Sequence, residues 1–132
     1  MAWDADILLE NANKFSDLIE TLKSDAALYE HVPHNAHLAV ELAAKSFLAR
    51  HGQPERDSHD FSVLFQLTFA QYPKGLLGAL QANENEDVYT AYKAIKSVWN
   101  MNKRYEKWKF KHNTVHNHCI AYKKVFKWIN TL

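Results

Sequence analysis

The sequence is poor in the residues that interrupt helices and in the residue that forms covalent cross-links. It contains 3 Gly, 3 Pro and 1 Cys in 132 residues. Few glycines and prolines leave few turns, which favours long helices over a sheet of many short strands. The single cysteine, Cys119, cannot form an internal disulfide, and we expect it in the core rather than as a nucleophile.

Membrane spans and common catalytic motifs are also missing. No run approaches the roughly 18 uncharged apolar residues that cross a bilayer. The first residues are acidic where a signal peptide would be basic, so we expect a cytoplasmic protein with no membrane partner. There is no Gly-rich phosphate loop and no Gly-x-Ser-x-Gly motif. The length predicts one domain over residues 1–132.

The charge, by contrast, is distributed very unevenly. Residues 1–92 carry 6 Lys/Arg and 14 Asp/Glu, whereas residues 93–132 carry 10 and 1. This basic part also holds Trp99, Trp108 and Trp128. Because Lys and Arg neutralise phosphates and flat rings stack on bases, the combination is typical of nucleic-acid binding. The alternative is a basic helix that docks on an acidic body or on an acidic partner.

Apolar residues recur at spacings of three and four along most of the chain, which predicts helices. With short connections between them, we expect an all-α fold, an antiparallel bundle of four to five helices. The predicted helices run from about 4 to 29, from 33 to 51, from 58 to 71, from 88 to 99 and from about 113 to the end, and Ser58 or Asp57 can cap the third. The predicted apolar faces hold Leu8, Phe15, Leu18, Ile19 and Leu22 of the first helix, Val88, Tyr92, Ile95 and Trp99 of the fourth, and Val115, Cys119, Tyr122, Phe126 and Ile129 of the last.

Eight histidines offer candidate metal ligands or proton-transfer groups. His34 and His37 share a helix face, with Glu41 one turn further, but no cysteine or further acidic residue completes a recognisable metal site. His112 and His116, four apart, share a face if the last helix begins at or before His112. Nearby lysines would repel a cation there, so we expect no metal at either place.

The segment 103–112 combines cationic, aromatic and imidazole side chains. An Arg and a His close in space can cleave RNA without a metal ion. The imidazole takes a proton from the 2′-hydroxyl or gives one to the leaving oxygen, and the guanidinium stabilises the charge that develops at phosphorus. The alternative is a segment that contacts phosphates or docks without catalysis.

A longer pattern occupies the second predicted helix and the start of the third. It reads A-x-E-x-A-x-K-x-x-L, ends at a glycine, and continues after a short loop with His-Asp. The residues that fit it are Ala39, Glu41, Ala43, Lys45, Leu48, Gly52, His59 and Asp60, followed by Phe61 where leucine is usual. This pattern resembles the HEPN family of small helical domains. Glu41 and Lys45, four apart, are expected to form a helix-surface ion pair. We expect His59 and Asp60 to stabilise the fold, because Asp60 in the first turn favours the positive end of the helix dipole and His59 can pack over the preceding loop.

The resemblance implies a four- or five-helix bundle that often dimerises, so a homodimer is expected. Many members are metal-independent endoribonucleases, often toxins paired with a small nucleotidyltransferase antitoxin. Others bind nucleotides or partners without catalysis. The alternative function here is therefore a non-catalytic binding or dimerisation module that engages an acidic partner through the basic part of the chain.

The resemblance also locates a candidate site. Ribonuclease members carry an Arg, four to six residues and then a His near the start of the last long helix. The corresponding candidates for catalysis are Arg104 and His112, which seven residues separate. The candidate residues for RNA binding are Lys103, Lys107, Trp108, Lys109, Lys111 and His116. No cofactor is expected.

Overall fold

The computed structural model describes residues 4–54, 58–98 and 112–132. These ranges contain helices and no β-strand, apart from one isolated β-bridge between Phe69 and Tyr72. This content confirms the predicted all-α class. The helices are α1 (Ala5–Leu22), η1 (Ala26–His31), α2 (Val32–Arg50), α3 (Phe61–Gln66), α4 (Gly75–Leu80), η2 (Asn83–Asn85), α5 (Glu86–Val98) and α6 (His112–Asn130). None of the described helices is long and apolar enough to cross a membrane.

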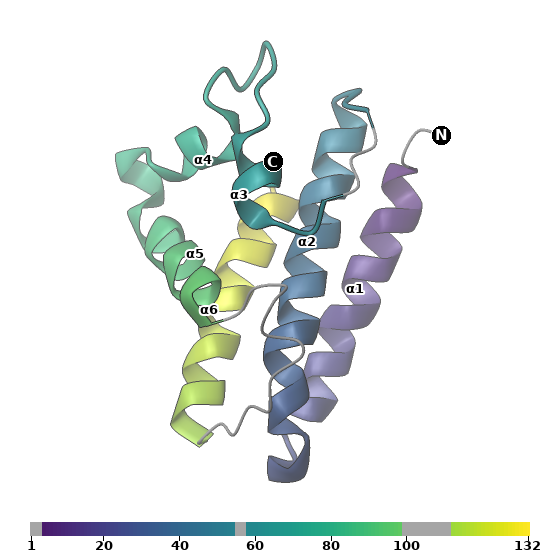
Figure 1. Ribbon diagram of the computed structural model, residues 1–132, viewed down its shortest axis with the longest axis vertical. Coiled ribbons are helices and arrows are strands. Elements are labelled where there is room, and N and C mark those ends of the chain that lie inside the picture. Colours follow the sequence, from purple (N-terminus) through teal and green to yellow (C-terminus); the bar gives the residue numbers. More distant parts are fainter. Residues whose placement is uncertain (1–3, 55–57, 99–111) are drawn as a thin grey trace.

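The longest helices of the described residues, α1, α2, α5 and α6, form the body of the molecule (Figure 1). In chain order, α1 and α2 are antiparallel neighbours, and so are α5 and α6. Helix α2 packs against both α1 and α6, and it runs in the same direction as α6. The starts of α2 and α6 therefore lie at the same end of the bundle, where the end of α1 also lies.

Helix α2 is the centre of the core. Most of its residues are buried, including Ala39 and Ala44, whose small side chains let neighbouring helices approach closely. The hydroxyl of Ser46 donates to the carbonyl of Ala5 at 2.8 Å, which fastens the start of α1 to α2. On α1, Ile19 and Leu22 are buried as predicted. Leu18, predicted on the same face, is instead 41% exposed.

The first helix is shorter than predicted. It ends at Leu22 instead of continuing to Tyr29, and the chain turns into η1. The carboxylate of Asp25 accepts a hydrogen bond from the backbone N–H of Ala27 at 3.0 Å and so caps η1. A short polar side chain of this kind competes with the helix for backbone groups, so it ends one helix and starts another.

The connection from α2 to α3 follows the predicted Gly–loop–His-Asp pattern. Gly52 has a φ of +74° and ends α2 as predicted, with Gly52 N–H bonded to Ala49 and Gln53 N–H bonded to Leu48. We predicted that Ser58 or Asp57 caps α3, but the cap is Asp60, whose carboxylate accepts from Ser62 N–H at 2.8 Å. Asp57 lies outside the described residues.

The third helix is also shorter than predicted, because α3 ends at Gln66 and a new helix, α4, begins at Gly75. Gly75 has a φ of +68°, and a Cβ there would lie 2.5 Å from the carbonyl oxygen of Phe65. Only glycine fits this close approach.

The predicted apolar faces of the last two helices are largely confirmed. Tyr92 and Ile95 of α5 are buried, and Val88 is half-buried; Trp99 lies outside the described residues. On α6 the predicted residues are all buried, and Cys119 is a core residue as expected; these residues are Val115, Cys119, Tyr122, Phe126 and Ile129.

Candidate functional site

Two exposed histidines occupy the start of α6. His112 is the first residue of the helix and His116 lies one turn further. Their rings are nearly parallel, with an interplanar angle of 12° and centroids 6.1 Å apart, so the shared face is confirmed. The structure therefore places two of the predicted site residues side by side at one end of the bundle.

Tyr29 holds the ring of His112 from a different part of the chain. Its hydroxyl lies 2.9 Å from His112 Nδ1, and the two ring centroids are 6.2 Å apart. Tyr29 belongs to η1 and is half-buried, and it lies 83 positions before His112 in the sequence. The sequence pattern places Tyr29 at the end of the first predicted helix, so Tyr29 is not among the predicted site residues.

An open pocket of about 170 Å³ lies beside the two histidines. Its lining residues are Lys23, Ser24, His112, Val115 and His116. Lys23 comes from the end of α1 and was not a predicted site residue. Its ammonium group pairs with Glu20 at 2.6 Å, so the cation is partly neutralised within the protein. The pocket thus combines two imidazoles with one lysine, groups that suit an anionic ligand.

The lysines of α6 explain part of the charge imbalance without any nucleic acid. Lys123 pairs with Glu20 on α1, and Lys124 pairs with Asp87 on α5 at 3.0 Å. The carboxylate of Glu20 accepts hydrogen bonds from Lys123 and Lys23, and these bonds lower its pKa. At these positions the basic helix docks on the acidic body of the same chain, which is the alternative raised by the sequence.

The other predicted site residues lie in the segment 99–111, outside the described residues. Their assignment to catalysis or RNA binding therefore stays a prediction, as does the approach of the guanidinium to His112. These residues are Lys103, Arg104, Lys107, Trp108, Lys109 and Lys111.

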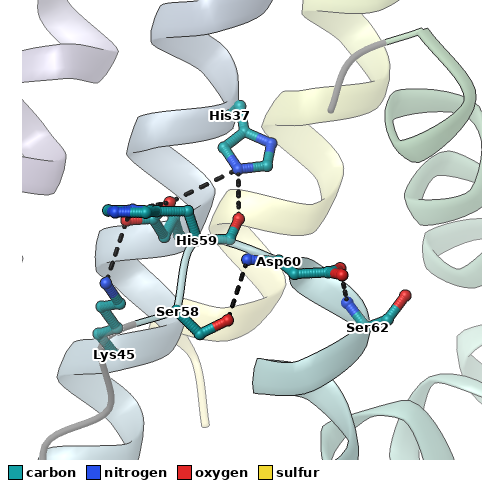
Figure 2. A network of polar contacts seen from close by, with 7 residues as sticks. His37, Lys45, Ser58, His59, Asp60 and Ser62 are labelled. Carbon is teal, nitrogen blue, oxygen red and sulfur yellow. Dashed lines mark hydrogen bonds and ion pairs between the residues drawn. The ribbon is translucent and has the colours of Figure 1, made fainter. Parts of the chain in front are cut away.

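A second group of polar side chains surrounds Glu41 in the middle of α2 (Figure 2). The carboxylate of Glu41 is only 2% exposed. Lys45 Nζ lies 3.2 Å from Oε2, and His59 Nδ1 lies 3.0 Å from the same oxygen. His37 Nε2 donates to the backbone carbonyl of His59 at 2.8 Å and lies 3.5 Å from Glu41 Oε1. We expected a surface ion pair between Glu41 and Lys45, but the pair is buried because the loop before α3 covers it.

This polar group ties the loop to α2 and leaves the carboxylate with no free oxygen. Burial by itself raises the pKa of Glu41, but the hydrogen bonds from His37 and His59 and the charge of Lys45 outweigh it, so the pKa is lowered. His37 also stacks on Phe61 with a centroid distance of 4.1 Å. These contacts support the expected fold-stabilising role of His59, and Asp60 adds the cap of α3.

The histidines near the start of α2 do not form a metal site in the part of the chain that the structure describes. No group of three or more potential ligands suited to a metal ion occurs in residues 4–54, 58–98 and 112–132. His37 faces His118 of α6 in the core, with Pro33, Phe61 and Ile95 around them. Burial, and then the charge of His37, lowers the pKa of His118 to about 4. His118 is therefore a neutral core residue near pH 7.

The helical bundle and the Gly–loop–His-Asp connection define a small all-α domain with a cationic pocket at one end. The family model described as HEPN domain matches residues 5–129, which is nearly the whole chain. The chain belongs to the HEPN family, and this membership supports a module that interacts with RNA or nucleotides. No curated protein and no solved structure matches the chain.

Proposed function

We propose that this HEPN domain binds RNA at the start of α6. The observation that carries the proposal is the exposed His112 ring, held by Tyr29, stacked on His116 and open to the pocket that Lys23 also lines. Imidazole and ammonium groups bind phosphate oxygens through charge-assisted hydrogen bonds. In the neighbouring segment, the four lysines 103, 107, 109 and 111 neutralise further phosphates and Trp108 stacks on a base.

We propose further that the domain cleaves the bound RNA without a metal ion. His112 takes the proton from a ribose 2′-hydroxyl, whose oxygen attacks the adjacent phosphorus as the bond to the 5′-oxygen breaks. The leaving 5′-oxygen takes a proton from water, and Arg104 stabilises the charge that develops on the phosphate oxygens. The products carry a 2′,3′-cyclic phosphate and a 5′-hydroxyl. Histidine suits this step because it exchanges protons near neutral pH.

The test is RNA cleavage by the purified protein in excess chelator. We expect the cyclic-phosphate product with the wild type and a loss of about 100-fold or more in rate with His112→Ala. Asn113→Ala, an exposed neighbour on the same helix turn, is the matched control and should retain activity. Intact RNA after prolonged incubation with the wild type would remove the enzyme proposal. RNA binding, measured by fluorescence anisotropy, would then decide whether the binding proposal survives.

The alternative is a non-catalytic module that engages an acidic partner through its basic part. Lys123 and Lys124 support it less well, because both already pair with acidic residues of the same chain. It predicts a stable complex and no RNA turnover. Self-association into a homodimer and a small nucleotidyltransferase as partner are the interactions that family membership makes worth testing, by light scattering and by co-purification.

A further inference from the structure

We infer that Tyr29 is the positioning residue of His112, which fixes both the orientation of the imidazole and the ring nitrogen that carries its proton. This inference deepens the proposed function, and it depends on that function only for its catalytic meaning. The contact itself is a property of the fold and can be tested without RNA.

Two contacts restrain the orientation of the His112 ring within the described residues. His112 is exposed on the first turn of its helix, where an imidazole would otherwise rotate among several staggered rotamers. The 2.9 Å contact between the Tyr29 hydroxyl and Nδ1 fixes one edge of the ring. The ring of His116 stacks on it from the next turn of the same helix. Among the described residues, two side chains therefore restrain the imidazole, and of these two Tyr29 forms the directional bond.

The tautomer of His112 decides whether its Nε2 atom can act as a base. A histidine acts as a base through the nitrogen that carries no proton, and the bond made by the other nitrogen decides which one this is. The hydroxyl of Tyr29 is both a donor and an acceptor, and in the arrangement that we infer its oxygen accepts a hydrogen bond from Nδ1–H. Neutral His112 then has its lone pair on Nε2, which is free to take a proton from a 2′-hydroxyl. The opposite tautomer would place the proton on Nε2 and prevent that step.

Tyr29 reaches His112 because the first helix is interrupted before it. Helix α1 ends at Leu22, and Asp25 caps η1, so that η1 rather than a continuing helix carries Tyr29. Helix η1 packs against the start of α6. The interruption of the first helix, which the sequence did not predict, is therefore what brings the phenol to the imidazole.

The direct test is nuclear magnetic resonance of ¹⁵N-labelled histidine in wild type and Tyr29→Phe. In the wild type, the neutral His112 ring should show the Nδ1–H tautomer. In Tyr29→Phe it should move towards the Nε2–H tautomer that free imidazole side chains prefer, while His116 stays unchanged. Tyr89→Phe is the matched control, because it removes a phenol that also makes one exposed hydrogen bond, to Gln81.

The functional arm measures RNA cleavage by the same variants. Loss of one hydrogen bond should lower kcat by about tenfold with KM within about twofold, as expected for a group that orients a proton-transfer residue. Unchanged ¹⁵N shifts of His112 in a folded Tyr29→Phe protein would overturn the inference. If that variant does not fold, missing nuclear Overhauser contacts between the Tyr29 and His112 rings in the wild type would overturn it as well.

The two proposals fail separately. If the wild type does not cleave RNA but the tautomer of His112 changes in Tyr29→Phe, the proposed ribonuclease activity is lost and the positioning role is retained as a structural fact. If cleavage occurs and Tyr29→Phe alters neither the tautomer nor kcat, the positioning role is lost and the activity stands.

Discussion

His59 Nδ1 lies 3.0 Å from the carboxylate of Glu41, although the two residues belong to different elements. The bond fastens the loop before α3 to the centre of α2. It is reinforced by His37, whose Nε2 donates to the carbonyl of His59, and by Lys45, which contacts the same carboxylate oxygen as His59. A buried carboxylate with this many partners stabilises one particular path of the loop.

Removing the charge of Glu41 should therefore cost stability. We expect Glu41→Gln to lower the free energy of unfolding by about 3 kcal/mol at pH 7, because the buried ion pair with Lys45 is broken. Urea denaturation of this variant and of Glu84→Gln, an exposed glutamate of η2, measures the difference. Equal stability of the two variants would show that the buried ion pair contributes little.

Stability should also fall as the pH falls from about 6.5 towards 4. His118 has its pKa lowered to about 4, so between these values the unfolded chain binds a proton that the folded protein does not. The loss amounts to about 3 kcal/mol for this one group. His37 is the titratable side chain that faces His118 in the described core.

Unfolding measured at pH 7, 6, 5 and 4 tests this dependence. His118→Gln, which cannot titrate, should give a shallower fall than the wild type, whereas His31→Gln, at an exposed histidine, should follow the wild type. Parallel curves for all three proteins would contradict the assignment. The contribution of Glu41 is separate, since its lowered pKa means that this stability is present above about pH 4.5 and lost below it.

The two glycines with positive φ should differ in their tolerance of alanine. Gly52→Ala faces open space and should cost about 1 kcal/mol for the left-handed backbone alone. Gly75→Ala adds a contact at 2.5 Å with the carbonyl oxygen of Phe65, so we expect a cost of about 3 kcal/mol or failure to fold. Thermal unfolding of the two variants measures this, and a Gly75→Ala protein as stable as Gly52→Ala would refute the close approach.

The hydrogen bond between Ser16 and Tyr122 should contribute modestly to stability. The two hydroxyl oxygens are 2.7 Å apart, and Tyr122 is fully buried between α1 and α6. Tyr122→Phe removes the bond but keeps the ring, so we expect a loss of about 1 kcal/mol. Comparing its midpoint of chemical denaturation with that of Tyr89→Phe, which loses an exposed hydrogen bond to Gln81, shows how much more the bond to Ser16 contributes.

The sequence by itself determined the helical class, the family and most of the core. Periodic apolar residues make the buried faces of α5 and α6 predictable, because a helix has a fixed number of residues per turn. The same is true of the end of α2 at Gly52, since few residues other than glycine adopt a positive φ. His112 and His116 share a face for the same geometric reason.

Only the tertiary structure decided which polar groups meet. Asp25 is a local signal for the break after Leu22, but nothing in the local sequence indicates that Tyr29 then meets His112, or that Lys123 pairs with Glu20. Burial of Glu41 likewise depends on the loop that carries His59 and not on the spacing within α2. Spacing along one helix fixes which residues share a face, whereas contacts between elements depend on how the whole chain packs.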